Sequence, residues 1–250
     1  MLLHLRTWPE VETYLKTSTT IIIPIGSTEQ HGPTGLIGTD AICGEAVGRK
    51  LGEVTGTLVA PTIAVGMAQH HLGFPGSMTL RPSTLIAVVK DNVESLARHG
   101  FTHFYFVNGH GGNVAPFSAA FSEIYAEASL ARPGNRPPIR CKLRNWYESA
   151  KVKAISKELY GDSEGSHATP SEVALTWAVY PEAVRKAKLD PEVAPRGEFT
   201  DAADYRRNFP DGRIGSNPNL ASIEAGKRLW DAAVADLADD LKAFSKMSAG

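Results

Sequence analysis

A strand, a glycine-rich turn and a helix follow one another in the middle of the chain, and this succession constrains the fold most. Residues 103–107 read His-Phe-Tyr-Phe-Val, an aromatic and β-branched run that is typical of a buried strand. The turn Asn108-Gly-His-Gly-Gly-Asn113 comes directly after it, and helical spacing continues from 114 to about 130. This order is the βα unit of a doubly wound sheet. The sequence therefore predicts a mainly parallel sheet with helices on both faces.

The rest of the chain repeats this alternation of short apolar runs and amphipathic segments. Residues 83–99, for example, place apolar side chains at three- and four-residue intervals and end at a glycine, as a helix does. We expect further strands over 20–25 and 138–143, a strand and its exit over 58–65, and further helices over 40–51, 170–180 and 221–245. Residues 133–138 are predicted to be a turn-rich connector. The expected architecture is a single α/β domain over 1–250 with three layers, α/β/α.

Composition and charge disfavour several classes of protein. The chain has 250 residues, of which 42% are hydrophobic and 21% charged, as in an ordinary globular domain. Its 26 basic and 27 acidic residues leave a net charge of −1, so we expect no nucleic-acid or membrane partner. Residues 1–9 lack the residue pattern of a secretory leader, so we expect none. The two cysteines, Cys43 and Cys141, cannot staple a fold of this size, so we expect reduced thiols and a cytoplasmic location.

A first group of polar residues follows the predicted strand 20–25. In the run Gly26-Ser-Thr-Glu-Gln-His-Gly-Pro33, Glu29 and His31 are two residues apart, so both side chains point the same way in an extended segment. A glycine-rich turn then brings Asp40 back towards them. Two carboxylates and an imidazole suit Zn²⁺, Mn²⁺ or Fe²⁺. In the alternative interpretation, Glu29 and His31 are solvated and Asp40 only caps the next helix.

A second group lies in the turn after residues 103–107. His110 stands between glycines at a predicted strand end, where its imidazole is free of bulky neighbours and can bind a metal ion. The second interpretation is an anion cradle formed by Gly109 to Gly112, as in a nucleotide-binding module. The run lacks the spacing of a dinucleotide fingerprint and the lysine of a P-loop. We therefore expect His110 to be a metal ligand.

A third group precedes the predicted helix 170–180. Thr169 and Glu172, with Pro170 between them, form a capping box, which is a complete structural explanation of Glu172. His167 lies just before this helix, in a turn where an imidazole can exchange protons near neutral pH. The segment alone assigns neither residue a role.

Weaker candidates surround these groups. His70 and His71 lie in a glycine-bracketed loop that either lines the same cavity or lies on the surface. Trp146 and Tyr147 follow a predicted strand and either wall a pocket or pack in the core. Residues 190–219 are rich in Pro, Gly, Asp and Asn, and a loop of this length in a compact domain is usually a functional or interface segment.

Taken together, these segments resemble the creatininase (creatinine amidohydrolase) family. The matching blocks occur in order at 24–33 with 39–40, at 71–79, at 106–113 and at 167–172. The resemblance implies an α/β/α fold, assembly as a homo-oligomer, often a hexamer, and a dinuclear metal centre that hydrolyses non-peptide amide C–N bonds of a small molecule.

The same resemblance implies roles for individual residues. Glu29, His31, Asp40 and His110 match the family's metal ligands, with Asp40 as the bridge between two ions, and His167 matches its proton shuttle. Creatinine-hydrolysing members carry a glutamate at the position of Gly112 and a tryptophan at the position of Ser163. The chain therefore resembles a glycine-form branch, in which Glu172 completes the second site.

The resulting expectation is an amidohydrolase with two divalent ions, Zn²⁺ first and Mn²⁺ or Fe²⁺ as alternatives. Its substrate is a cyclic amide, lactam or formamide, and its catalytic residues are His167 and Glu172. A pyrimidine formamide deformylase, a processing peptidase and the nucleotide-binding module are the alternative functions. Six residues are expected to contact substrate: His70, His71, Ser77, Asn108, Gly111 and Trp146.

Overall fold

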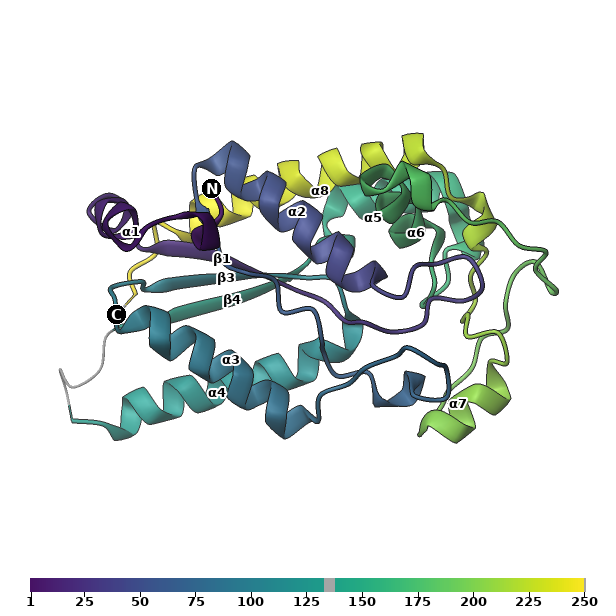
Figure 1. Cartoon of the computed structure of the whole chain (residues 1–250), viewed down its shortest axis with the longest axis horizontal. Helices are drawn as coiled ribbons and strands as arrows, with labels where there is room; N and C mark the ends of the chain where they lie inside the picture. Colours follow the sequence, from purple (N-terminus) through teal and green to yellow (C-terminus); the bar gives the residue numbers. More distant parts are fainter. Residues whose placement is uncertain (133–137, 250) are drawn as a thin grey trace.

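The computed structural model describes residues 1–132 and 138–249, and it is built around a parallel sheet (Figure 1). The strands are β1 (Thr20–Ile25), β2 (Leu58–Val59), β3 (His103–Asn108) and β4 (Arg140–Asn145). Their order is β2-β1-β3-β4, and every adjacent pair is parallel. The predicted mainly parallel α/β fold is thus confirmed, while the predicted connector at 133–138 falls almost entirely outside the described residues.

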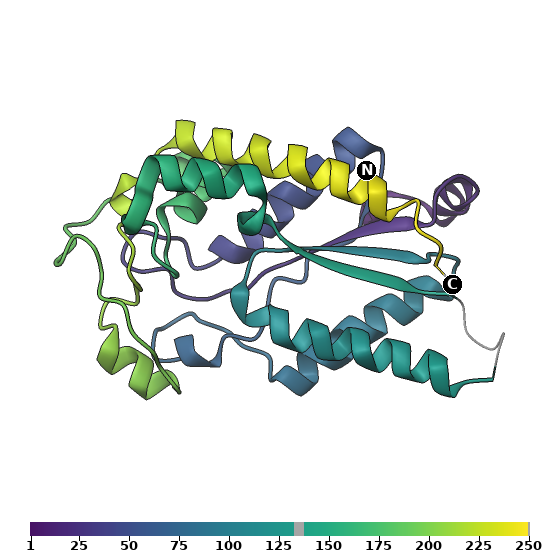
Figure 2. The same ribbon diagram turned by 180° about the vertical axis from the view of Figure 1, so that it is seen from behind.

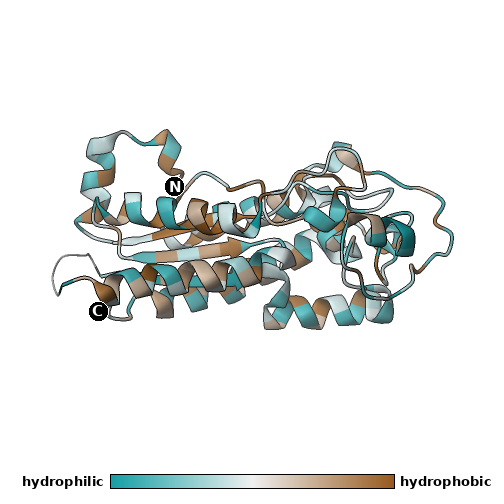
Figure 3. Ribbon diagram, turned by 90° about the horizontal axis from the view of Figure 1, so that it is seen from below, coloured by the Kyte–Doolittle hydropathy of each residue, from teal (hydrophilic) through white to brown (hydrophobic). Residues whose placement is uncertain are grey.

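The central strands are buried on both faces, and this explains their composition. All residues of β1 and β3 are buried. Ile22 and Tyr105 contribute to one apolar cluster, whereas Ile21 and Phe104 contribute to the cluster on the opposite face, because successive side chains of a strand alternate. Figure 3 shows the largely hydrophobic strands between helices of mixed hydropathy.

Helices cover both faces of the sheet (Figures 1 and 2). The apolar cluster on one face draws on α2, α5, α6 and α8, and the cluster on the other face draws on α3 and α4. The helices are α1 (Trp8–Leu15), α2 (Thr39–Thr55), α3 (Pro82–Ala97), α4 (Val114–Leu130), α5 (Ala150–Tyr160), α6 (Pro170–Val179), α7 (Ala202–Asn208) and α8 (Ile223–Phe244). Within the described part of the chain, no helix combines the length and apolarity needed to cross a bilayer.

The structure adds detail to two predicted segments. Of the strand and exit expected over 58–65, only Leu58 and Val59 pair in the ladder, because Pro61 offers no N–H and the chain rejoins β1 at a bridge between Ile25 and Ile63. The loop expected over 190–219 contains the short helix α7, whose start is capped by Asp201. Helices α1 and α5 were not predicted.

The loops after the strands gather at the carboxyl edge of the sheet, on the right in Figure 1. The segment leading to α7 lies at the same end. In parallel α/β sheets this edge is where ligands bind. The functional site is therefore expected at the carboxyl edge of the sheet.

Candidate metal centre

Asp40 lies at the centre of a buried group of carboxylates and imidazoles. It stands in the first turn of α2, and its side chain is 3% exposed. Its Oδ1 lies 3.0 Å from Nε2 of His31, and its Oδ2 lies 3.0 Å from Nδ1 of His110. Each oxygen of one carboxylate thus faces a different imidazole.

The other nitrogen of each imidazole faces a backbone carbonyl. Nδ1 of His31 lies 3.1 Å from the carbonyl of Glu29, and Nε2 of His110 lies 3.0 Å from that of Met67. A carbonyl only accepts hydrogen bonds, so these nitrogens carry the protons of the neutral rings. In the neutral rings, the unprotonated nitrogens then face the oxygens of Asp40. The lone pairs of these nitrogens and oxygens repel one another unless a proton or a cation lies between them. Metal-binding histidines show the same pattern, with the second N–H given to a carbonyl.

The electrostatics of the protein without a cation lead to the same conclusion. Burial alone would lower the pKa of His31, but the carboxylates of Asp40 and Glu172 raise it to about 10. Burial would also lower the pKa of His110, but the carboxylates of Glu29 and Asp40 raise it to about 9. Both imidazoles oppose the effect of burial on Asp40 and hold its pKa well below the usual range. The site therefore strongly favours positive charge on both sides of Asp40.

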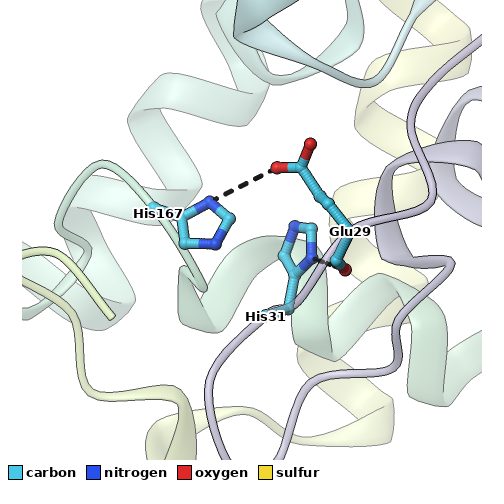
Figure 4. A group of neighbouring side chains, drawn as sticks. All are labelled: Glu29, His31 and His167. Carbon is cyan, nitrogen blue, oxygen red and sulfur yellow. Dashed lines mark hydrogen bonds and ion pairs between the residues drawn. The ribbon is translucent and has the colours of Figure 1, made fainter. Parts of the chain in front are cut away.

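Glu29 is a buried carboxylate whose oxygens have no aligned hydrogen-bond donor. It is 0% exposed, and neither Oε1 nor Oε2 forms a hydrogen bond. Nitrogens are nevertheless close: Nε2 of His71 lies 3.0 Å from Oε1, and Nε2 of His110 lies 3.3 Å from Oε2. Figure 4 shows the third, Nδ1 of His167, which lies 3.8 Å from Oε1. Burial raises its pKa. Such a carboxylate is costly to bury unless a cation compensates it.

Glu172 has two contacts that both use its carboxylate. Its Oε1 accepts a hydrogen bond of 2.6 Å from the backbone N–H of Thr169, which completes the predicted capping box of α6. The same oxygen lies 3.8 Å from Nε2 of His31. Burial, reinforced by Asp40, raises the pKa of Glu172 to about 7. The cap therefore explains only part of the environment of this side chain.

These side chains form three groups that could hold a metal ion. The potential ligand atoms within each group lie within 4.8 Å of one another. The groups are Glu29–Asp40–His110, His31–Asp40–Glu172 and Glu29–His31–His167. The first two share Asp40 and divide the carboxylates and imidazoles evenly between them. Mixed nitrogen and oxygen donors of this kind fit Zn²⁺, Mn²⁺ or Fe²⁺.

The glycines of the turn after β3 allow close packing. A Cβ atom at Gly109 would lie 2.1 Å from the carbonyl oxygen of Asp40, and one at Gly112 would lie 2.4 Å from Nε2 of His110. Glycine is thus needed so that this turn can approach the start of α2 and let His110 reach Asp40. The interpretation of Gly109 to Gly112 as an anion cradle is not needed to explain these glycines.

The group opens into a cavity of about 820 Å³. Of the residues expected to contact substrate, His70, His71 and Gly111 line it, as do Asp40, His110, His167 and Glu172. His71 has both ring nitrogens close to protein atoms, 2.9 Å from Nε2 of Gln30 and 3.0 Å from Glu29. His70 is half-buried and packs against Phe199 with ring centroids 4.7 Å apart.

The other three residues expected to contact substrate do not line the cavity. The hydroxyl of Ser77 accepts the backbone N–H of Gln30, and the Asn108 amide holds the backbone of His110. Trp146 is fully buried in the apolar core, and its neighbour Tyr147 lines the cavity instead.

Residues 190–217 supply a wall of the cavity. Sequence analysis indicated that this segment is functional, but not which of its residues line the cavity. Phe199, Tyr205 and Ile214 all line it. The buried Arg213 holds the segment in place by donating hydrogen bonds to the carbonyls of Pro191, Glu192 and Ser216. A single arginine among polar loop residues gives no periodic signal by which sequence analysis could find this role.

The fold and the site together define a class of protein, an α/β protein with a candidate metal centre of carboxylates and imidazoles at the carboxyl edge of its parallel sheet. The model of the family described as "Creatininase: Creatinine amidohydrolase" matches residues 4–241. The chain belongs to this family, and it is an enzyme.

Several relatives are similar over most of the chain. A mycofactocin precursor peptide peptidase from Mycobacterium ulcerans is 36% identical over 94% of this chain and 83% of its own length. A creatinine amidohydrolase from Pseudomonas putida is 26% identical, with 94% of each chain covered. A 3-dehydro-scyllo-inosose hydrolase from Thermotoga maritima is 30% identical over 86% of this chain and 64% of its own length.

Solved structures of creatininases share the fold. A mutant creatininase of Zn–Zn type superimposes with a TM-score of 0.81 at 27% identity, with 98% of each chain covered. A manganese creatininase gives a TM-score of 0.82 at 26% identity and covers 98% of this chain and 99% of its own. A metal-dependent character of this hydrolase agrees with these neighbours.

Proposed function

We propose that the chain is an amidohydrolase that cleaves a non-peptide amide C–N bond, in a cyclic amide, lactam or formamide, with water at a dinuclear metal centre. The observation that carries the proposal is the position of Asp40, whose two oxygens each face a ring nitrogen of a different imidazole at 3.0 Å. A carboxylate in this position is suited to bridge two cations.

The chain's own residues divide the work as follows. Glu29 and His110 would hold one cation on one side of Asp40, and His31 and Glu172 would hold the other. When bound, a pair of divalent cations supplies a water of lowered pKa and polarises the amide carbonyl. His167, which lines the cavity beside Glu29, transfers a proton to the leaving nitrogen.

Elemental analysis and a substrate panel test this proposal. Freshly purified protein should contain two equivalents of Zn²⁺, Mn²⁺ or Fe²⁺ per chain and should hydrolyse at least one member of a panel of creatinine, other cyclic amides and formamides. Chelation should abolish turnover, and the metal should restore it. Full turnover in metal-free protein would contradict the proposal.

A processing peptidase is the second candidate function. Two observations favour it: the 36% identity to a mycofactocin precursor peptide peptidase, and a cavity of about 820 Å³, which lies in the upper part of the roughly 300–1,000 Å³ range of ligand pockets. Short peptides in the same panel decide between the two functions. A formamide deformylase is tested by the formamide members of the panel.

We also propose that the chain forms a homo-oligomer, with a hexamer as the expected state. The support is the family resemblance alone. Light scattering coupled to gel filtration measures the molar mass and would contradict the proposal if the chain is a monomer.

A further inference from the structure

Gln30 lies between Glu29 and His31, and its buried side-chain amide has only one possible orientation. The side chain is 7% exposed. Its Oε1 accepts a hydrogen bond of 2.8 Å from the backbone N–H of Gly32, and its Nε2 donates one of 2.9 Å to the carbonyl of Gly212. An N–H can only donate and a carbonyl can only accept, so exchanging the amide oxygen and nitrogen would break both bonds.

The backbone carbonyl of Gln30 determines the tautomer of His167. Nε2 of His167 lies 2.8 Å from this carbonyl oxygen. Since a carbonyl only accepts, the proton of the neutral ring is on Nε2. Nδ1 is then unprotonated, and it is the nitrogen that lies 3.8 Å from Oε1 of Glu29.

The side-chain amide of Gln30 determines the tautomer of His71. Its Nε2 carries two hydrogens, of which one goes to Gly212. The second has three neighbours, Nδ1 of His71 and Nε2 of His167, each 2.9 Å away, and the hydroxyl oxygen of Tyr205, 3.4 Å away. Because the His167 nitrogen already carries a proton and the Tyr205 oxygen is more distant, the second hydrogen goes to Nδ1 of His71. The proton of His71 is therefore on its Nε2, 3.0 Å from Oε1 of Glu29.

We propose that Gln30 is a positioning residue that sets the tautomers of both His71 and His167. Through His71 it keeps an N–H 3.0 Å from Oε1 of Glu29. Through His167 it keeps an unprotonated Nδ1 beside the cluster, ready to accept a proton. Both effects act through other residues, and Gln30 itself touches no reacting atom.

The packing of the two rings makes this control of tautomers effective. His71 and His167 stack with centroids 4.3 Å apart and an interplanar angle of 25°, and Tyr205 packs edge-on against His71 with centroids 4.7 Å apart. These ring contacts favour the orientations in which the hydrogen bonds to Gln30 form. The competing explanation is that Gln30 only ties the loop after β1 to the backbone of Gly212.

Nitrogen NMR of protein labelled with ¹⁵N-histidine separates the two explanations and needs no substrate. In the wild-type protein, both loaded with zinc and metal-free, His71 should show an unprotonated Nδ1 and a protonated Nε2 near neutral pH. His167 should also show a protonated Nε2. A proton on Nδ1 of His71 in the zinc-loaded wild type overturns the proposal without any variant being required.

Two variants then probe the side chain directly. Gln30→Glu is isosteric but replaces the donating NH₂ by an acceptor, so Nδ1 of His71 should become protonated. The control Tyr205→Phe removes a hydroxyl that donates a hydrogen bond of 2.8 Å to the same Gly212 carbonyl and lies 3.4 Å from Nε2 of Gln30, but it keeps the Gln30 amide and both of its ring partners. It should leave both nitrogen spectra unchanged. An unchanged His71 spectrum in Gln30→Glu means that Gln30 only ties the loop.

The kinetic readout rests on the proposed function. With a hydrolysable substrate, Gln30→Glu should lower kcat about 10- to 100-fold, the usual effect of losing a residue that orients the groups of a metal site, with KM little changed. Failure of the substrate panel leaves the NMR result intact, so the two proposals fail separately. An unchanged kcat together with a protonated Nδ1 of His71 would contradict the catalytic relevance of this tautomer.

Discussion

The floor and the outer wall of the cavity are built on different principles. We call Glu29, His31, Asp40, His110 and Glu172 the floor; their side chains are at most 14% exposed, and they lie within a few ångströms of one another. The outer wall consists of Tyr147, Lys153, Lys157, Phe199 and Tyr205. Lys153 and Lys157 are exposed, and within the described residues neither forms an ion pair.

This difference separates reaction from specificity. The floor holds its charges in a fixed arrangement, as the reaction requires. Apart from the buried Tyr205, the wall is partly exposed, so we expect changes there to affect the floor less than changes within the floor. Relatives that match most of this chain carry the names of hydrolases for different substrates, as expected if the wall varies while the floor is kept. Substitutions in the floor should therefore affect metal binding and kcat, whereas substitutions in the wall should affect KM.

Asp40→Asn should have the largest effect. An amide offers one oxygen in place of two and carries no charge, so it cannot serve both sides of the floor. We expect turnover to fall to the level of a blank and both metal equivalents to be lost, measured by mass spectrometry. The control Asp162→Asn changes another carboxylate that lines the cavity and should keep the metal. Two equivalents retained in Asp40→Asn would disprove the bridging role.

His167→Ala should lower kcat about 10²- to 10⁴-fold, the usual contribution of a general acid or base. Metal content should stay at two equivalents, because the proposed ligand groups do not use this ring. Loss of one equivalent would instead favour the group Glu29–His31–His167. His70→Ala removes a neighbouring imidazole of the cavity and should keep most of kcat.

Glu172→Gln tests the side chain that links cap and floor. The amide oxygen can still accept the N–H of Thr169, so the helix cap should survive while one metal equivalent is lost. The matched control is Thr169→Ala, which removes the capping hydroxyl and should cost about 1 kcal/mol of stability without loss of metal. Metal titration and thermal unfolding of both variants measure this. Two equivalents retained in Glu172→Gln would make the residue a cap only.

Most of the floor could be predicted from sequence for a physical reason. Glu29 follows β1, and His110 follows β3, and the carboxyl ends of adjacent parallel strands meet at one edge. Sequence could not decide between the two roles of Glu172, since its capping box is complete without any ligand. The family resemblance, rather than the spacing, indicated the second role.

The wall could not be predicted residue by residue. Phe199 and Tyr205 come from a segment without helical or strand periodicity, whose path depends on the buried contacts of Arg213. Gln30 was missed because a glutamine gives no signal until its neighbours in space are known. Trp146 was placed in the wall rather than in the core because an aromatic residue after a strand fits both environments.

The floor should also make the stability of the metal-free protein depend on pH. His31 and His110 have pKa values raised to about 10 and about 9 from 6.5, so folding is favoured while they are protonated. This contribution is complete below pH 6.5 and is lost as the pH rises through the raised values. Between pH 7.5 and 9.5 the Tm of chelator-treated protein should fall, by about 2–4 °C for each kcal/mol lost. The Tm of a metal-loaded sample should fall less over the same pH range. If the Tm of both samples falls equally, the pairing of protonated His31 and His110 with the carboxylates of the floor is contradicted.

Phe199→Ala should have the smallest effect, because it changes only the wall. The Phe199 ring is half-buried and packs on His70 and Tyr205, with ring centroids 4.7 and 4.8 Å away. Neither of these two neighbours is a floor residue. We expect KM to rise by at most about tenfold, equivalent to about 1.4 kcal/mol, with kcat and metal content unchanged. Val193→Ala is the control, an exposed apolar residue of the same segment outside the cavity lining. A fall in kcat with unchanged KM would mean instead that Phe199 makes an interaction present only in the transition state, so that the wall takes part in the reaction step.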